Sequence, residues 1–249
     1  MGIPAVTPPA APAAESLGPA AASFDRGRQR LWWRICRRLP VVRKPIGVGP
    51  WTFDIACVPD EDWACARLEQ AARTGQADEP RWQPYWIIPW ESSQALAAHL
   101  LRQPLDHMWV LDLGCGVGLA GTVAAACGAR VLLVDAVPEA ILLARWNSWP
   151  WKSRAVCRCL DWRNGRLTRR FDWIIGADIL YDAKDWPYLH DFWLWHLAPE
   201  GKVLLSEPTR PVADTFAQWA AANGWGVHEP PAVVIANRHI RFFQLERRR

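Results

Sequence analysis

Apolar residues from position 108 onward follow two alternating patterns, continuous short runs and runs with helical spacing. The continuous runs predict buried strands over 108–113, 129–135, 154–160, 171–178 and 201–207. Apolar residues three or four positions apart predict helices over 119–128, 137–147, 182–197 and 211–224. Such alternation indicates an α/β fold, a doubly wound parallel sheet with helices on both faces. The last stretches, 226–236 and 239–248, follow each other without a helix, so we expect them to end a seven-stranded sheet as an antiparallel hairpin.

The segment before residue 81 has a different pattern and predicts an N-terminal extension. Residues 1–24 are rich in alanine and proline with almost no bulky apolar side chain, which is typical of a disordered tail. Residues 25–39 predict an amphipathic basic helix, 41–58 two short strands around a Gly-Pro turn, and 60–74 a second helix. We therefore divide the chain into a tail (1–24), an extension (25–80) and a principal domain (81–249).

Positive charge is concentrated in the extension. Residues 25–44 hold eight arginines and lysines and the single acid Asp25, whereas the net charge of the whole chain is +4. A solvated helix packed on the domain is the simpler interpretation; a contact with RNA, a ribosome or a membrane surface is the alternative.

The cysteines favour a reducing compartment. All seven lack metal-ligand spacing and their number is odd, so we expect neither a disulfide framework nor a bound metal. We see no signal peptide and no apolar run long enough for a membrane span, and expect a soluble, cytoplasmic, monomeric protein.

The strongest local motif is VLDLGCGVGLAG at 110–121. A predicted strand ends, glycines at 114, 116 and 118 allow a tight turn close to a ligand, and a helix begins. Asp135 ends the next strand, where a carboxylate can accept hydrogen bonds from ribose hydroxyls. Together these features predict a nucleoside-cofactor site.

The same glycines also satisfy the GxGxxG pattern of dinucleotide-binding proteins, so NAD is an alternative cofactor. Asp112 argues against NAD, because a carboxylate just before the glycines would repel a pyrophosphate and attract a cationic ligand. S-adenosylmethionine, with its sulfonium and ammonium groups, suits such an acidic site better.

Six segments in this order, PYWIIPWESSQALA, VLDLGCGVGLAG, VLLVDAVPEA, CLDWRNG, FDWIIGADILYD and GKVLLSEPTR, resemble the seven-β-strand S-adenosylmethionine-dependent methyltransferases, whose fold is Rossmann-like. They are most similar to family 16, which includes protein lysine methyltransferases. The resemblance covers about residues 80–247, so residues 81–249 are predicted to be a methyltransferase domain.

The resemblance implies a set of cofactor contacts. Gly114, Cys115 and Gly116 would line the methionine part, and Gly118 of the same loop is a further cofactor-binding residue. Asp112 would lie near the amino group and Asp135 at the ribose. The remaining contacts implied are Asp161 and Trp162 at the adenine, Ala177 close to the cofactor, and Trp90 covering it. A helix cap or a solvated loop residue is the alternative interpretation of Asp161, and a core residue that of Trp162.

The catalytic residues implied by the resemblance are Asp178 and Tyr181, which match a DxxY motif of the lysine-directed branch. Enzymes that methylate planar nitrogens resemble one another in an Asn/Asp-Pro-Pro-aromatic motif at this position, whereas this chain has ADILYD. We therefore expect N-methylation of a protein lysine, with Asp178 and Tyr181 orienting the amine. The role of Arg210, in GKVLLSEPTR, stays open at this point. Small-molecule methylation, a non-catalytic RNA-associated scaffold and an NAD-dependent oxidoreductase remain alternatives.

The stretch PYWIIPWE at 84–91 contains two prolines and three aromatic residues. It predicts a stiff, extended strip that lies over the mouth of the cofactor site. Ile87 and Ile88 would hold the strip in the core. Trp90, and with it Tyr85, Trp86 and Glu91, would form a wall between cofactor and substrate.

Overall fold

The computed structural model describes residues 25–59, 61–75 and 83–248. The predicted disordered tail, 1–24, lies outside the described residues. The helices are α1 (Arg26–Cys36), α2 (Glu61–Arg73), α3 (Glu91–Leu100), α4 (Leu119–Ala126), α5 (Pro138–Asn147), α6 (Trp186–His196) and α7 (Phe216–Ala222). The strands are β1 (Val42–Val48), β2 (Trp51–Cys57), β3 (Trp109–Leu113), β4 (Arg130–Asp135), β5 (Ala155–Cys159), β6 (Phe171–Ala177), β7 (Leu197–Glu207), β8 (Trp225–His228), β9 (Val233–Ile235) and β10 (Arg238–Arg247).

The central sheet has the strand order β5-β4-β3-β6-β7-β10-β8, with β9 paired to the start of β10. Strands β5, β4, β3, β6 and β7 are parallel, and β10 is antiparallel to β7, β8 and β9. The order reverses direction between β3 and β6, which is where doubly wound sheets place their ligands. The predicted sheet with its antiparallel end is confirmed. The stretch predicted as one strand over 226–236 is divided into β8 and β9, which pair with opposite ends of β10.

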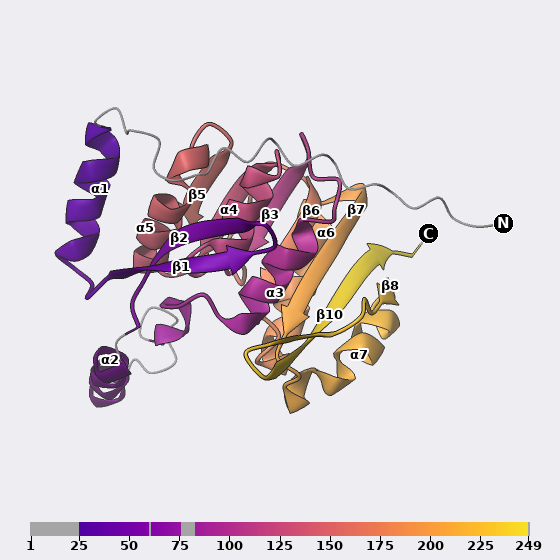
Figure 1. Ribbon diagram of the computed structural model, residues 1–249. Coiled ribbons are helices and arrows are strands. Elements are labelled where there is room, and N and C mark those ends of the chain that lie inside the picture. The colour runs from indigo at the N-terminus through magenta and orange to yellow at the C-terminus, as the bar shows by residue number, and fades with distance from the viewer. Residues whose placement is uncertain (1–24, 60, 76–82, 249) are drawn as a thin grey trace.

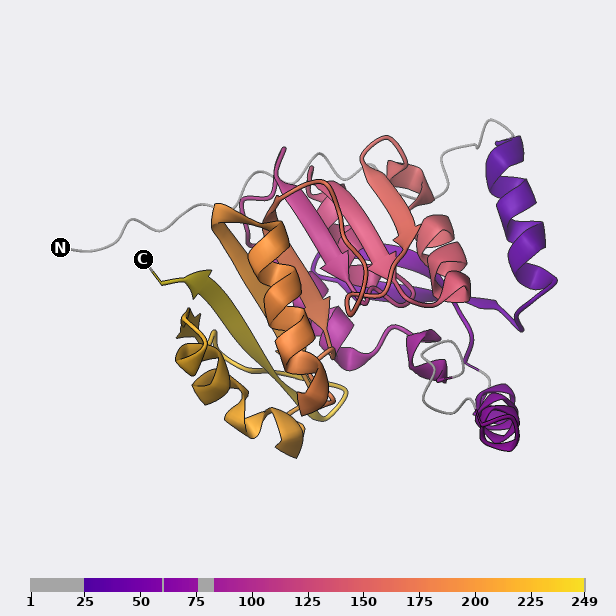
Figure 2. The ribbon, with the colours of Figure 1, turned by 180° about the vertical axis from the view of Figure 1, so that it is seen from behind.

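Helices lie on both faces of the sheet. Helices α3, α4 and α5 cover the face seen in Figure 1, and α6 and α7 lie on the opposite face, seen in Figure 2. The largest core cluster lies between β6, β7, β10 and helices α6 and α7, and includes Trp193, Phe216 and Trp225. Within the described residues, no helix combines the length and apolar character needed to traverse a lipid bilayer.

Two predicted boundaries moved. Strand β7 begins at Leu197, because Leu197 already pairs with Phe171, whereas the Ala-Pro-Glu-Gly run at 198–201 favours a turn. The helix expected over 211–224 is divided into a 3-10 turn (Pro211–Thr215) and α7. Neither shift moves a predicted site residue.

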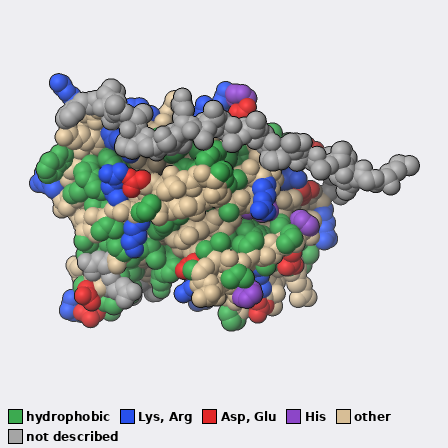
Figure 3. Space-filling view, in the orientation of Figure 1, with side chains coloured by type: hydrophobic (Ala, Val, Ile, Leu, Met, Phe, Trp, Pro, Cys, Tyr) green, Lys and Arg blue, Asp and Glu red, His purple; other side chains and the backbone are tan. Residues whose placement is uncertain are grey.

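The extension packs on the side of the sheet that carries α5 (Figure 1). Leu31 and Ile35 of α1 are buried, and the Trp32 ring lies 4.6 Å from that of Trp146. Arginines remain exposed on α1, and the space-filling view shows Lys and Arg side chains along that edge (Figure 3). This arrangement is that of an amphipathic helix packed on the domain.

Asn147, at the end of α5, connects the extension to the glycine loop. Its side chain is buried; the amide oxygen accepts a hydrogen bond from Ala56 N at 2.7 Å, and Nδ2 donates to Ala56 O at 3.1 Å and to Val117 O at 2.8 Å. Ala56 belongs to β2 and Val117 to the glycine loop, so one side chain satisfies backbone groups of both segments.

Candidate functional site

The glycine loop joins β3 to α4 in left-handed backbone conformations. Gly114, Gly116 and Gly118 have φ angles of 65°, 53° and 80°. A Cβ at Gly118 would lie 2.9 Å from the Ala144 side chain, so this glycine lets the loop pack against α5. A Cβ at Gly116 would meet only the Trp86 backbone, at 3.4 Å. Gly118 is therefore required by packing, whereas Gly116 keeps the loop open toward the strip above it.

Asp135 ends β4 and is tied to the glycine loop. Its Oδ2 accepts a hydrogen bond from Gly116 N and its Oδ1 one from Val137 N, both at 2.9 Å. Burial raises the pKa of Asp135 to about 6, although these backbone donors act in the opposite direction. The buried carboxylate lies beside the glycines, as the sequence motif predicted.

Asp112, on β3, is a second buried carboxylate in the same place. Its Oδ2 accepts a hydrogen bond from Gly121 N at 2.8 Å. The pKa of Asp112 is raised to about 7, mainly by burial and to a smaller extent by the nearby Asp135, while the hydrogen bond from Gly121 N acts in the opposite direction. Burial and both carboxylates also hold the pKa of the intervening Cys115 thiol well above its usual value. Across the described ranges, neither Asp112 nor Asp135 has a cationic side chain within ion-pair distance, so the site suits a positively charged ligand.

The raised pKa of Asp112 predicts a pH-dependent stability. The folded protein holds this proton more tightly than the unfolded chain, so the contribution of Asp112 to stability is greatest at low pH and is lost as pH rises from about 4 to about 7. We expect Asp112→Asn, which removes the ionisation, to reduce this decline by an amount on the order of a few kcal/mol. Urea unfolding at about pH 5 and about pH 8 measures it.

Asp191→Asn, which alters an exposed carboxylate on α6, is the matched control and should keep the wild-type pH dependence. An Asp112→Asn protein with the same decline as wild type would show that Asp112 is already ionised across this range.

Asp161 and Trp162 follow β5. The Asp161 carboxylate accepts a hydrogen bond from Arg163 N at 2.9 Å, as a turn residue does. The Trp162 ring lies over the glycine loop, 3.2 Å from the position of a Cβ on Gly114. Its indole Nε1 is buried without a hydrogen-bond acceptor among the described residues. Trp162 therefore reaches the place where the motif predicts a cofactor, while Asp161 stabilises the turn that carries it.

Asp178 lies directly after β6, next to Ala177. It has a φ of 56°, uncommon for a residue other than glycine, and its N–H donates to Ser206 O on β7 at 2.7 Å. The carboxylate forms a two-pronged ion pair with Arg210, whose Nε and Nη2 each lie 2.8 Å from one oxygen. The sequence left the role of Arg210 open; in the structure it fixes the orientation of Asp178.

Arg210 is itself held by a chain of charged groups that sequence reasoning missed. Its backbone N–H donates to Glu207 Oε2 at 2.8 Å, and its carbonyl accepts from Arg241 Nη2 at 3.0 Å. Arg241 also pairs with Glu207 and with Asp214. The only sequence signal was the charged run Glu207-Pro-Thr-Arg210 after a strand.

Tyr181 stands at the rim of the site with about two-fifths of its surface exposed. Burial of its hydroxyl raises the pKa of Tyr181 to about 12, and the Asp185 carboxylate contributes in the same direction. Asp185 is paired with Arg163 through contacts of 3.0 and 2.8 Å. The Tyr181 hydroxyl therefore stays neutral at physiological pH and can serve as a hydrogen-bonding group.

The strip 84–91 crosses over the glycine loop, with the Trp86 backbone above Gly116. The prediction that the strip is extended is wrong, because Pro84–Trp86 forms a 3-10 turn and Ile87 continues it in a right-handed helical conformation. Trp86 and Ile87 are buried in the core with Ile88 packed against it, and the Trp86 carbonyl lies over Gly116. Trp90 precedes α3, is only half-buried, and donates its indole N–H to Tyr85 O. Trp86 thus belongs to the core, whereas Trp90 and the exposed Tyr85 lie on the open side of the strip.

This placement yields a prediction for the two tryptophans. Trp90→Ala should weaken S-adenosylmethionine binding about tenfold and lower the free energy of unfolding by only about 1 kcal/mol, because little of its packing is in the core. Trp86→Ala is the matched comparison and should cost about 3–5 kcal/mol. Calorimetric titration and urea unfolding of both variants measure the two effects; the reverse ranking would place Trp90 in the core.

The sheet, its reversal between β3 and β6 and the acidic glycine loop define a doubly wound α/β protein with a nucleoside-cofactor site. A family model described as "Methyltransferase domain" matches residues 91–247. The chain belongs to this methyltransferase family.

Curated relatives include two groups of lysine methyltransferases. The electron transfer flavoprotein beta subunit lysine methyltransferase of Danio rerio is 31% identical over 131 residues, 51% of this chain and 51% of that protein. Protein N-lysine methyltransferase METTL21A of Xenopus tropicalis is 32% identical over 127 residues, 47% of this chain and 58% of the relative. The chain thus spans about half the length of these relatives.

Solved structures share the fold. The N-methyltransferase NodS from Bradyrhizobium japonicum, in complex with S-adenosyl-L-homocysteine, has a TM-score of 0.53 and 18% identity, covering 72% of this chain and 97% of that one. A putative RNA methyltransferase from Pyrococcus horikoshii has a TM-score of 0.54 and 16% identity, covering 74% and 98%. At these identities the likeness supports the doubly wound fold alone.

Proposed function

We propose that the protein is an S-adenosylmethionine-dependent methyltransferase that methylates a lysine side chain of a protein. The observation that carries the proposal is the pair of buried carboxylates, Asp112 and Asp135, beside an open glycine loop and without a cationic partner in the described part of the chain. A ligand with sulfonium and ammonium charges and ribose hydroxyls would satisfy both carboxylates.

The residues present fit this cofactor, which supplies an activated methyl group when bound. Asp112 and the loop residues Gly114, Cys115 and Gly116 would hold its methionine part, and Asp135 its ribose. Gly118, which packs against α5, would keep the cofactor loop in position. The adenine would contact Asp161 and Trp162, and Ala177 and Trp90 would approach from the two remaining sides.

The lysine relatives and the placement of Asp178 support a protein amine as acceptor. An aliphatic ammonium of pKa about 10.4 has to lose a proton before transfer, which an apolar setting promotes. Tyr85, Trp90 and Tyr181 are half-buried or exposed, and they would supply aromatic walls for an amine that binds beside the Asp178 carboxylate. The Arg210 guanidinium occupies one lone pair on each carboxylate oxygen of Asp178. The remaining lone pairs of these oxygens would orient the amine nitrogen or accept its proton.

The test is transfer of a labelled methyl group from S-adenosylmethionine to proteins of a cell lysate. We expect labelled protein; label found only in small molecules would overturn the lysine assignment. S-adenosylhomocysteine, and not NADH, should raise the melting temperature, since only a ligand that binds the folded state stabilises it. The reverse result would favour an oxidoreductase.

A non-catalytic scaffold that binds RNA or a ribosome through residues 25–44 is the second candidate. Arg28 of α1 lies over the Trp146 ring at 4.5 Å, and Asp25 pairs with Lys152, so part of this helix is engaged within the protein. These contacts favour a packed helix. Salt-sensitive RNA binding without methyl transfer would support the scaffold. We also propose that the protein is a monomer and that it is located in the cytoplasm.

A further inference from the structure

Three strands of the sheet lack a helix on one face in the described part of the chain. Helices α4 and α5 cover one side of β3, β4 and β5, and Figure 2 shows the other side without a helix in front of it. The β5–β6 connection, residues 160–170, crosses this face because it returns from the carboxyl end of β5 to the amino end of β6. We call this surface, with the connection beside it, the bare face.

The bare face holds a hollow of about 550 Å³ with an apolar floor. The apolar residues that line it are Trp109, Val131, Leu132, Val156, Leu167 and Phe171, of which Val131 and Phe171 are buried. Val156 is 59% exposed in the middle of β5. The exposed Val156 and the half-buried Trp109, Leu132 and Leu167 give the hollow an apolar surface that a bound segment can cover.

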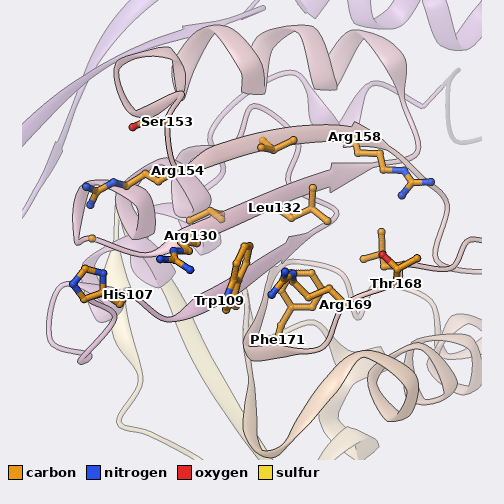
Figure 4. Close-up of a pocket in the computed structure, with 14 residues that line it drawn as sticks. His107, Trp109, Arg130, Leu132, Ser153, Arg154, Arg158, Thr168, Arg169 and Phe171 are labelled. Atoms are coloured by element: carbon orange, nitrogen blue, oxygen red, sulfur yellow. The ribbon is translucent and has the colours of Figure 1, made fainter.

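The rim of the hollow is basic. Arg130, Arg154, Arg158 and Arg169 are all exposed, and no acidic side chain lines the hollow. Among the described residues, none of the four has a carboxylate within ion-pair distance. Figure 4 shows Arg130 and Arg154 at one end of the strands and Arg158 at the other. The hollow therefore presents uncompensated positive charge around an apolar centre.

Arg169 is held in place by an aromatic ring. Its guanidinium lies over the Trp109 ring, 3.6 Å from the centroid, and Arg130 lies 5.4 Å from the same ring. A stacked guanidinium keeps its N–H donors, which lie in its own plane, available for a carboxylate. The same stacking covers a face of the Trp109 indole, which a nucleic-acid base would otherwise use.

We propose that the bare face binds an extended segment of a partner protein that carries both carboxylates and aliphatic side chains. The four arginines match the carboxylates, and Leu132, Val156 and Leu167 match aliphatic side chains, for which a nucleic acid has no counterpart. The face is about 17 Å long, the length of a five-residue strand, and reaches Arg158 one residue before the end of β5. A segment bound there ends near Asp161, at the edge of the cofactor site.

Fluorescence anisotropy with the full-length protein tests this proposal. The probes are a labelled peptide in which glutamate alternates with leucine, one in which glutamate alternates with serine, and a single-stranded oligouridylate. We expect the Glu/Leu peptide to bind about tenfold more tightly than either other probe. The Arg130→Glu and Arg158→Glu double variant should weaken that binding about tenfold or more.

The Arg30→Glu and Arg34→Glu double variant, which makes the same charge change on exposed α1, is the matched control and should bind as wild type does. Val156→Lys is a second variant. It should weaken binding of the Glu/Leu peptide although it adds a positive charge, because it removes an apolar contact. Preferred binding of the oligouridylate, absence of binding by the Glu/Leu peptide, or equal losses in the control would overturn the proposal. The assay contains no cofactor, so its failure leaves the proposed methyl transfer untouched.

Discussion

Replacing Asp178 by asparagine is expected to lower kcat for methyl transfer about 100-fold or more, within the range for a group that handles a proton or orients a nucleophile. Asparagine is the informative substitution because it tolerates the left-handed backbone found at this position, at φ 56°. Asparagine keeps the side-chain shape but removes the negative charge of the carboxylate, which pairs with Arg210 and would also face the amine. Steady-state assays with saturating S-adenosylmethionine measure the change.

The stability of this variant should change little. The ion pair that it loses is partly exposed at Arg210, with 44% of that side chain accessible, and such pairs contribute roughly 1 kcal/mol or less. Asp182→Asn is the matched control, since Asp182 is a nearby carboxylate that only accepts a hydrogen bond from Lys184 N. Similar activities of Asp178→Asn and Asp182→Asn would show that Asp178 has only a structural role at the end of β6.

Substitution of Gly116 by alanine is expected to reduce the affinity for S-adenosylmethionine at least about tenfold. The added methyl group would enter the space between the loop and the strip, 3.4 Å from the Trp86 carbonyl. It would also strain the left-handed backbone by about 1–2 kcal/mol. Calorimetric titration measures the affinity and thermal unfolding measures the strain.

Gly224→Ala separates these two effects. Gly224 also has a left-handed φ, 87°, but a Cβ there meets no atom within 4 Å, and it lies between α7 and β8. Both variants should therefore lose similar stability, while only Gly116→Ala loses cofactor affinity. Equal affinities would mean that the cofactor does not approach this part of the loop.

Local patterns were sufficient to predict the strands and helices that carry the cofactor motif. The glycines and Asp135 could be placed together because a strand, a tight turn and a helix were each evident in the residues themselves. The start of β7 could not be placed, because pairing of Leu197 with Phe171 overrides the turn preference of the Pro-Glu-Gly run. Tertiary pairing decided this boundary.

The charged network around Asp178 was the part of the site that the sequence concealed. Asp178 and Arg210 are 32 positions apart, and their contact depends on how two neighbouring strands end. The bare face was equally hidden. The sequence predicts a connection without a helix at 160–170, but it does not indicate which side chains this connection leaves exposed. Both features depend on positions in space that no local pattern contains.

The side chain of Asn147 connects the extension to the glycine loop of the candidate site by hydrogen bonds. It binds both backbone groups of Ala56 in β2 and the carbonyl of Val117 in the glycine loop, all in a buried setting. Without β2, two of its three hydrogen bonds would vanish, and a buried amide without partners costs about 1–3 kcal/mol. The hairpin thus supports the glycine loop through Asn147, and we expect residues 81–249 without the extension to bind the cofactor less tightly than the full chain does.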